Sequence, residues 1–331
     1  MRRAALASFL AAVSIAAFAA DAPGPAEEPV SRLDTVVVTG AQPGPGLWRV
    51  SKDEHVLWIL GTMTPLPKKM AWVSTEVEAT VAASQEVVLG PSATLEVGVF
   101  AGLALLPSLV GARNNPDGRQ LSEVMPAELY ARWLPLKQRY LATDRDVEKH
   151  RPIFAANELY EAAIDRAGLS GANVFEPVVT RAAKKHGVPI TRPLLKLKVE
   201  KPREAMKEFK KSPLDDLECF ERTLARVDGD LDAMKTRANA WATGDLQALR
   251  DLPYADQYSA CEDAVLRATV SQERGLDELK PKLRKLWLDA AENALVKNAS
   301  TFAVLSMREL LGDEGLLAEL RAKGYEVLEP E

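Results

Sequence analysis

The stretch GLWRVSKDEHVLWILGTMTPLP, residues 46–67, contains the clearest fold signal in the sequence. Two apolar runs flank the polar segment SKDE, which is the pattern of a β-hairpin. The second run ends abruptly at Gly61, and the hydroxyl side chains of Thr62 and Thr64 follow it. Strands that end in a glycine-containing turn are places where α/β proteins often bind ligands. The stretch therefore predicts the first strands of a sheet and one loop of a site.

The residues after this stretch extend the pattern to a complete βαβ unit. The segment WVSTEVEATVAAS has Val73, Val77 and Val81 at helical spacing. The segment EVVLG then indicates a buried strand that ends at Gly90. Strand, helix and strand in this order predict two parallel strands joined by a crossover helix.

The C-terminus repeats this plan. We expect a strand at STFAVLSM, a loop at RELLG, a helix at DEGLLAELRAKG and a strand at YEVLEP. Asp313 is the expected N-cap of the helix, and Gly324 follows its last turn. A third, partial copy lies at EPVVTRAAKKHGVPITRP, where Gly187 ends a helix before a strand.

The rest of the chain is predominantly helical in pattern, especially the tract 202–298, which is rich in Leu, Ala, Lys and Glu. The predicted fold class is therefore α/β (α+β), with a central mixed sheet built from N- and C-terminal βαβ units and a large helical insertion. The predicted organisation is a signal peptide at 1–20, a flexible linker at 21–45 and a single domain at 46–331, in which about 200–297 form a helical subdomain.

The N-terminus has two arginines, an apolar run and the sequence Ala-Phe-Ala at 17–19, which is the order of regions in a secretory signal peptide. We expect cleavage near Ala19 or Ala20, a periplasmic or secreted protein, and no stable membrane span after cleavage. The alternative is an uncleaved membrane anchor. Loss of Arg2 and Arg3 would change the formal net charge from −5 to −7, which argues against a nucleic-acid partner.

The chain has two cysteines, Cys219 and Cys261. In an oxidising compartment an even pair of this kind predicts a disulfide. Two buried free thiols are the alternative. Neither cysteine belongs to a C-x-x-C motif, so redox catalysis is not predicted.

Two further segments allow more than one interpretation. The β-prone residues from Asp34 to Gly40 are interpreted as an edge strand of the protein's own sheet, or as a strand that docks on a partner's sheet, as near the N-terminus of TonB-dependent receptors. The uncharged segment 97–112 is interpreted as a buried helix or helical hairpin, or as a patch facing a partner or a membrane.

If the two βαβ units share one sheet, three loops should meet at the carboxyl ends of its strands. These are the loops at 61–65, 90–92 and 306–312. The side chains they offer for chemistry are those of Thr62, Thr64, Ser92, Ser306, Arg308 and Glu309.

From about residue 46 to 330 the sequence resembles the TraB/GumN family, which includes the Tiki metalloproteases. The segment LWRVSKDEHVLWILGTMTPLP resembles the opening of that family, where a strand ends in G-T-x-H. The segment VVLGPS resembles its next strand, and AWATGDLQAL resembles its W-x-x-G-D segment. The segment TFAVLSMRELLGDEGLLAELRAKGYEV resembles its closing unit, where a G-x-x-H-L-x-G loop precedes the helix.

The resemblance implies a divalent-metal site, but this chain departs from the family at four site positions. Thr64 replaces the first histidine, Gly90 replaces an acidic residue, and Glu309 replaces the second histidine. A further acidic residue is missing from Thr191-Arg192-Pro193. We therefore expect no metal or other cofactor, and a vestigial site at Gly61, Thr62, Thr64, Gly90, Ser306, Arg308 and Glu309.

The remaining histidines, His55, His150 and His186, have no ligand spacing and are interpreted as surface or capping residues. The leading hypothesis is a catalytically inactive relative of metal-dependent hydrolases that binds a peptide, a glycan or another protein of the cell envelope. The alternative is an active hydrolase or peptidase with relocated catalytic groups, Glu309 and Thr64. A third hypothesis is a transport-system accessory protein that docks through Asp34 to Gly40.

Overall fold

The structure is a computed structural model that describes residues 42–96, 110–142, 144–212, 214–252, 257–268, 271, 276, 278–312 and 314–330. The predicted signal peptide, the strand from Asp34 to Gly40, Asp313 and most of segment 97–112 lie outside these residues. The described residues belong to one compact unit. None of the helices in this part of the chain has the length and apolar character needed to cross a bilayer.

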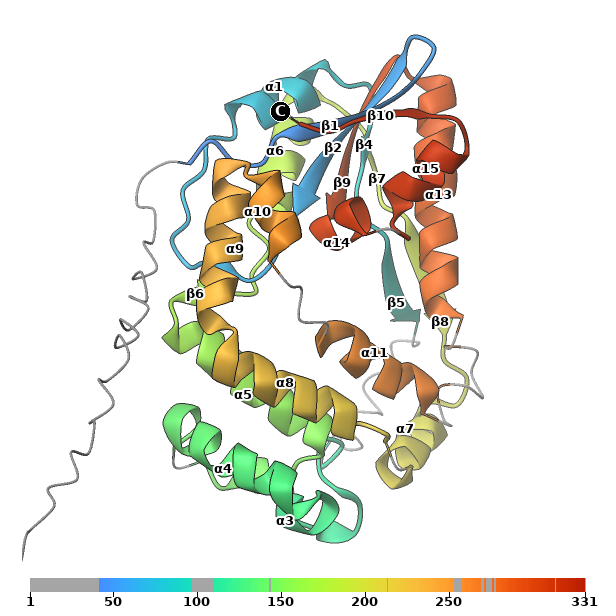
Figure 1. The fold of residues 1–331 in the computed structure, drawn as a ribbon. Helices are drawn as coiled ribbons and strands as arrows, with labels where there is room; N and C mark the ends of the chain where they lie inside the picture. Colours follow the sequence, from blue (N-terminus) through green and yellow to red (C-terminus); the bar gives the residue numbers. More distant parts are fainter. Residues whose placement is uncertain are drawn as a thin grey trace, which may run out of the picture. The chain divides into compact units, whose positions relative to one another are not determined.

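The described residues form a six-stranded mixed sheet (Figure 1). Strand β1 pairs antiparallel with β2 and β10, whereas β2, β9, β4 and β7 run parallel to one another. The predicted hairpin is confirmed as β1 and β2. In spatial order the strands are β10 (Glu326–Leu328), β1 (Leu47–Lys52), β2 (His55–Thr62), β9 (Ser300–Ser306), β4 (Val87–Val88) and β7 (Ile190–Thr191).

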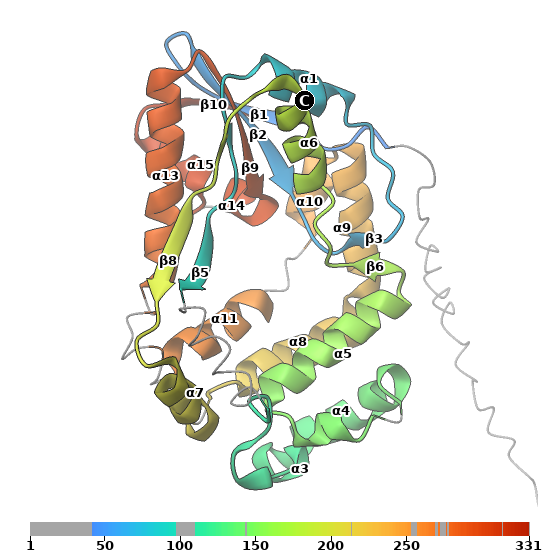
Figure 2. The same cartoon turned by 180° about the vertical axis from the view of Figure 1, so that it is seen from behind.

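Helical crossovers connect the parallel strands. Helix α1 (Thr75–Ala83) connects β2 to β4, and β9 lies between these two strands. Helices α14 (Met307–Leu311) and α15 (Leu316–Ala322) connect β9 to β10, and α6 (Glu176–His186) precedes β7. Helix α13 (Leu279–Lys297) lies on one side of the sheet, and α1 and α6 lie on the other (Figures 1 and 2). The two predicted βαβ units therefore interleave in one sheet, which confirms the α/β class.

The central strands have near-continuous apolar sequences because both faces of the sheet are covered. Leu57 and Ile59 of β2 and Phe302 of β9 are fully buried. Trp287 and Ala291 of α13 belong to the same core. This packing places the carboxyl ends of β2, β9 and β4 along one edge.

A second hydrophobic cluster lies among the helices away from the sheet and includes Trp133, Tyr160 and Phe220. The predicted helical tract contributes to both clusters, since Phe220 belongs to this one and Trp241 to the sheet core. The helices not yet named are α3 (Leu121–Val124), α4 (Ala127–Tyr140), α5 (Pro152–Arg166), α7 (Pro202–Lys211), α8 (Leu217–Gly229), α9 (Leu231–Thr243), α10 (Leu246–Asp251) and α11 (Gln257–Arg267), with 3₁₀ turns at Pro116–Gly118 and Asp146–Lys149.

Two small two-stranded sheets complete the described fold. Strand β3 (Leu66–Pro67) pairs antiparallel with β6 (Leu169–Ser170). Strand β5 (Ser92–Glu96) pairs parallel with β8 (Leu194–Lys198). Because β5 follows β4 and β8 follows β7, this second pair continues beyond the carboxyl ends of the main sheet.

Several local predictions are wrong. The segment RELLG forms helix α14 rather than a loop, because the Ser306 hydroxyl caps it by accepting the Glu309 N–H at 3.4 Å. Gly315, not Asp313, is the N-cap of α15. Val73 lies outside α1 and is 45% exposed, since α1 begins only at Thr75. Strand β4 ends at Val88, before Gly90.

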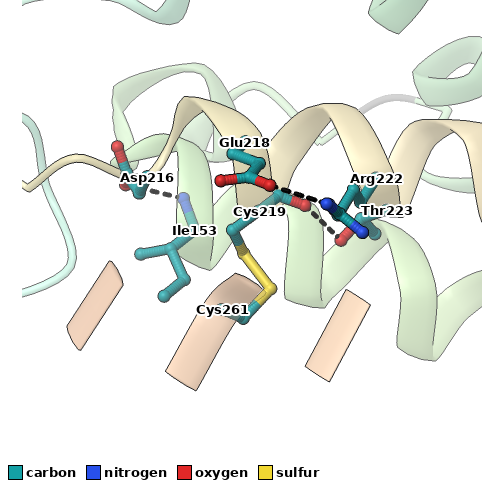
Figure 3. The surroundings of a disulfide bond; sticks show 7 residues. All are labelled: Ile153, Asp216, Glu218, Cys219, Arg222, Thr223 and Cys261. Atoms are coloured by element: carbon teal, nitrogen blue, oxygen red, sulfur yellow. Dashed lines mark hydrogen bonds and ion pairs between the residues drawn. A yellow bond between two sulfur atoms is a disulfide. The ribbon is translucent and has the colours of Figure 1, made fainter. Parts of the chain in front are cut away.

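The sulfur atoms of Cys219 and Cys261 lie 2.01 Å apart, at disulfide distance (Figure 3). The pairing predicted from the cysteine count is therefore confirmed. It joins α8 to α11 across a sequence separation of 42 residues.

Candidate functional site

The turn after β2 lies directly beside the end of β9. Thr62 is the register partner of Ser306, and the Thr62 hydroxyl donates a hydrogen bond to the Leu305 carbonyl at 3.1 Å. A Cβ at Gly61 would lie 2.7 Å from the sulfur of Met307 and 2.8 Å from the ring of Trp48. Only glycine fits at this position without displacing its neighbours.

The AWATGDLQAL segment supports this turn from α9. The buried Trp241 indole N–H donates to the Gly61 carbonyl at 2.9 Å. Gly244 adopts a left-handed conformation, with φ +75°, and ends α9. The Asp245 carboxylate then accepts the Ala248 N–H at 2.9 Å and caps α10. In this chain Trp241 therefore positions the turn, while Gly244 and Asp245 shape the connection from α9 to α10.

A cleft of ≈ 820 Å³ opens at the carboxyl ends of β2, β4 and β9. Five residues of the predicted site line it: Thr62, Gly90, Ser306, Arg308 and Glu309. Gly61 and Thr64 are not among its described lining residues. The structure thus brings the three predicted loops together, while the role assigned to their residues stays a prediction.

Glu309 forms an ion pair inside this cleft. Its Oε2 lies 2.8 Å from Nη1 of Arg284, a residue of α13. The other guanidinium nitrogen of Arg284 donates to the Glu314 carbonyl at 2.8 Å and lies 3.5 Å from the Glu319 carboxylate. The carboxylate of Glu309 is therefore neutralised by a cation that other groups also hold in place.

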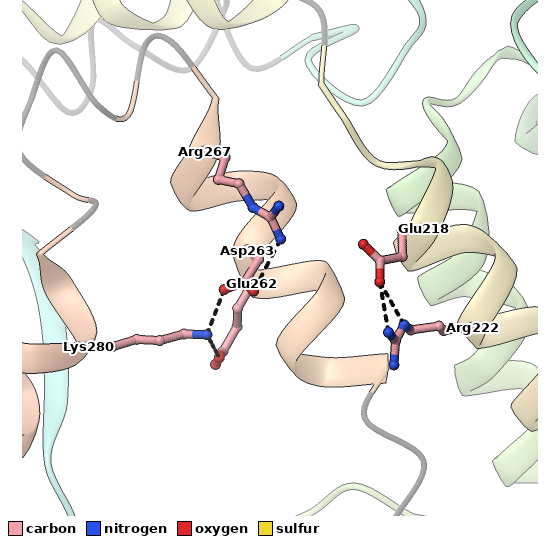
Figure 4. Close-up of polar contacts among 6 residues, drawn as sticks. All are labelled: Glu218, Arg222, Glu262, Asp263, Arg267 and Lys280. Atoms are coloured by element: carbon pink, nitrogen blue, oxygen red, sulfur yellow. Dashed lines mark hydrogen bonds and ion pairs between the residues drawn. The ribbon is translucent and has the colours of Figure 1, made fainter.

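Of the other cations that line the cleft, Arg192 and Lys280 are each paired with a carboxylate. Arg192 lies 2.5 Å from Glu176. Lys280 reaches from α13 to α11, where it lies 2.8 Å from Asp263 and 3.3 Å from Glu262 (Figure 4). Burial opposes the charge of Lys280, but the hydrogen bond to Asp263 and the charge of Glu262 outweigh it and raise the Lys280 pKa. The hydrogen bond from Lys280 lowers the pKa of Asp263.

The donor set in the cleft does not fit a divalent metal ion. Among the described residues, no group of three or more His, Cys, Asp or Glu side chains is arranged to hold one. None of the three histidines is among the described lining residues. His55 contacts the Asn298 carbonyl at 2.7 Å, His150 lies 3.3 Å from Glu158, and His186 lies in the last turn of α6.

A lack of space for a side chain does not explain why residue 90 is a glycine. A Cβ there would meet only the Val304 carbonyl oxygen, at 3.5 Å, which is an ordinary contact. A side chain at position 90 could therefore be accommodated, whereas a side chain at position 61 would clash with its neighbours.

The sequence analysis missed the helical side of the cleft. Lys280, Leu283 and Arg284 line it from α13, and Ser259 and Glu262 line it from α11. The spacing of the three α13 residues, i, i+3 and i+4, places them on one helix face. That signal was available, but it does not say which part of the fold the face meets.

A family model described as the TraB/PrgY/gumN family matches residues 46–328. The match covers most of the chain and coincides with the region of the resemblance inferred from the sequence. No curated protein and no solved structure matches the chain.

Proposed function

Because the chain belongs to the TraB/PrgY/gumN family, we propose that it is an exported member that uses its cleft to bind a ligand and does not catalyse metal-dependent hydrolysis. The proposed location is the periplasm or the cell exterior, and the proposed partners are envelope molecules. Strand docking through Asp34 to Gly40 remains a prediction, because these residues lie outside the described part.

The observation that carries this proposal is the ion pair between Glu309 and Arg284, 2.8 Å apart. Glu309 stands where the resemblance places a metal-binding histidine. A guanidinium at this distance repels a divalent cation and occupies the oxygen that would bind it. Arg192 lies in the segment 191–193, from which the family's further acidic residue is missing, and it pairs with Glu176. A cation therefore lies beside one of the four altered positions, Glu309, and another cation, Arg192, lies within a second altered segment.

A hydrolase built on Glu309 and Thr64 has weaker support. Thr64 is not among the described lining residues of the cleft. The Thr62 hydroxyl donates to the Leu305 carbonyl, and no histidine lies among the described lining residues to act as a base.

The lining of the cleft supports a polar ligand. The Ser92 hydroxyl lines the cleft, and the hydroxyls of Thr62 and Ser306, each used in one internal hydrogen bond, can make a further one. The described lining has four cations and four carboxylates, so it does not favour one sign of ligand charge: Arg192, Lys280, Arg284 and Arg308, and Glu176, Glu262, Glu309 and Glu314. Peptides and glycans both meet these requirements.

The decisive experiment measures metal content and hydrolysis together. Purified protein is incubated with Mn²⁺, Co²⁺ or Zn²⁺, and bound metal, peptidase turnover and esterase turnover are measured. We expect no stoichiometric metal and no metal-dependent turnover. Metal-dependent turnover that Glu309→Ala abolishes would refute the proposal. The matched control is Glu292→Ala, because Glu292 also forms an ion pair, with Lys323 at 3.0 Å, but is not among the described residues lining the cleft.

Export is tested separately. The disulfide distance between Cys219 and Cys261 is compatible with an oxidising compartment. We expect the mature protein, recovered from the periplasm or medium of a bacterial host, to begin near Ala20 or Asp21 when its N-terminus is sequenced. Retention of Met1 in the cytoplasmic fraction would contradict this part of the proposal.

A further inference from the structure

A second cavity of ≈ 550 Å³ lies between α5, α8, α11 and α13. Its lining is largely aliphatic and aromatic, unlike that of the first cleft. Ile153 and Phe154 come from α5, Val265 and Leu266 from α11, and Leu279 and Leu283 from α13.

The apolar cavity adjoins the polar cleft. Glu262, Lys280 and Leu283 line both spaces. Lys280 and Glu262, together with Asp263, form the charged boundary between them (Figure 4). A ligand that crosses this boundary would place a polar part in the cleft and an apolar part in the cavity.

The helices that line the cavity are connected to one another. Cys261 lines it and is bonded to Cys219 of α8 (Figure 3). Tyr258, also in the lining, donates a hydrogen bond from its hydroxyl to that of Tyr160 at 3.1 Å. Helix α11 is thus held against α8 by the disulfide and against α5 by the hydrogen bond, which favours a cavity that exists before a ligand binds.

We propose that this cavity binds a single aliphatic chain of an amphiphilic ligand whose polar head lies in the cleft. The cavity also has polar lining groups on α5 and α8, Asn157, Glu158 and Thr223, and Arg113 beside them pairs with Glu158. A volume of this size with a mainly apolar lining and a few polar groups is typical of small-molecule sites. A head that is zwitterionic or uncharged fits best, because Arg192, Lys280 and Arg284 are already paired with carboxylates. This inference rests on the proposed binding function of the cleft and specifies its ligand class.

The test uses dodecylphosphocholine, kept below its micelle concentration, in titration calorimetry with the full-length mature protein. Phosphocholine without the alkyl chain is the control ligand. We expect the alkylated probe to bind and the bare head to bind far more weakly, because burial of each methylene contributes about 0.8 kcal/mol. Absence of binding by dodecylphosphocholine would overturn the inference.

Val265→Trp locates the binding site. Val265 is 39% exposed and lines the cavity, so a larger side chain there fills space without disturbing the core. Displacement of two methylene groups should weaken binding by about tenfold. Val296→Trp is the matched control, because Val296 is 79% exposed, lies on α13 and is not among the described lining residues.

Equal affinity for dodecylphosphocholine in Val265→Trp, Val296→Trp and the parent would refute the assignment of the binding site to this cavity. Val265→Lys repeats the test with a charge, and circular dichroism of each variant verifies that it is folded. Dodecylphosphocholine has no peptide or carboxylic ester bond. Metal-dependent peptidase activity would therefore refute the proposed function and leave the binding of dodecylphosphocholine unchanged. Absence of dodecylphosphocholine binding would refute only the inference about the cavity.

Discussion

The two walls of the cleft are held together by different interactions. The sheet wall consists of the turns after β2, β4 and β9. The turn after β2 is held by packing and by the hydrogen bond from Trp241 to the Gly61 carbonyl. The helical wall consists of α11 and the first turns of α13. It is held by ion pairs such as Arg284 with Glu309 and by the bond between Cys219 and Cys261.

This difference separates residues that build the cleft from residues that determine its chemistry. Gly61 of the sheet wall and Trp241 of α9, which supports it, are buried and constrained by contacts. Both residues carry the family resemblance. Gly90 has space for a side chain, and Glu309 has a cation against it. The departures from the family pattern thus include positions where a change of side chain leaves the packing intact.

The largest expected effect is that of Trp241→Ala. Trp241 is fully buried in the sheet core, and its loss leaves a cavity and a Gly61 carbonyl without its donor. We expect the free energy of unfolding to fall by about 3–5 kcal/mol, measured by urea denaturation. A loss below about 1 kcal/mol would show that this contact does not support the sheet wall.

The next effect concerns the helical wall. Replacement of both Cys219 and Cys261 by serine removes a cross-link with a sequence separation of 42 residues. Chain entropy predicts a loss of about 4 kcal/mol in the free energy of unfolding, again measured in urea. The unreduced parent is the reference, and reduction of the parent should reproduce the loss. An unchanged midpoint would indicate that α11 is held by other contacts.

Asp216 at the start of α8 provides a pH test of the helical region. Its carboxylate accepts the Ile153 N–H at 2.9 Å (Figure 3), and burial raises its pKa from 3.8 to about 6. Between about pH 4 and 6 the folded state therefore binds more protons than the unfolded state, so this group makes the protein less stable as pH rises.

The integrated contribution of Asp216 is at most about 3 kcal/mol. We expect Asp216→Asn to reduce the pH dependence of the urea midpoint in this window, because the amide keeps a hydrogen-bond acceptor but does not ionise. A pH dependence identical to that of the parent would assign the effect to other groups.

The two glycines of the sheet wall give a smaller and directly matched comparison. Gly61→Ala places a methyl group 2.7–2.9 Å from Met307, Trp48 and Leu310. We expect a loss of about 1–3 kcal/mol in the free energy of unfolding from overpacking. Gly90→Ala should change this quantity by less than about 0.5 kcal/mol, since its nearest atom would lie 3.5 Å away. Equal losses would refute the distinction between the two positions.

Much of the sheet wall could be predicted from the sequence because its signals are local. The apolar runs of β2 and β9 and the glycine after the first of them indicate strands and a turn within a few residues. The parallel order of the strands then brings Thr62 and Ser306 together. Helix α14 was missed although its signal is also local, because Ser306 and Glu309 have the S-x-x-E spacing that marks a helix start and the Ser306 hydroxyl caps the helix.

The helical wall could not be predicted in the same way. Arg284 and Glu309 are 25 residues apart in sequence, and nothing near either residue specifies the other. An arginine on an amphipathic helix is usually solvated, so its partner becomes known only when the helix is docked. The second cavity has the same origin, since Phe154, Val265 and Leu279 come from three different helices.

Arg284→Gln is expected to have the smallest effect on stability. The side chains of Arg284 and Glu309 are 34% and 26% exposed, and ion pairs of this kind contribute below about 1 kcal/mol. Lys285→Gln is the control on the same helix, because Lys285 pairs with Asp289 at 2.7 Å. Both variants should unfold within about 1 kcal/mol of the parent in urea.

The two variants should differ in another property, because only Arg284→Gln removes the cation beside Glu309. The cleft lining of that variant becomes more negative by one charge, so weak, non-stoichiometric binding of Mn²⁺ should increase there and not in Lys285→Gln, as measured by metal titration. A loss of stability above about 3 kcal/mol in Arg284→Gln would instead place Arg284 among the residues that build the cleft. The division between the two walls would then have to be withdrawn, because an ion pair of the helical wall would be as important to folding as the packing around Gly61.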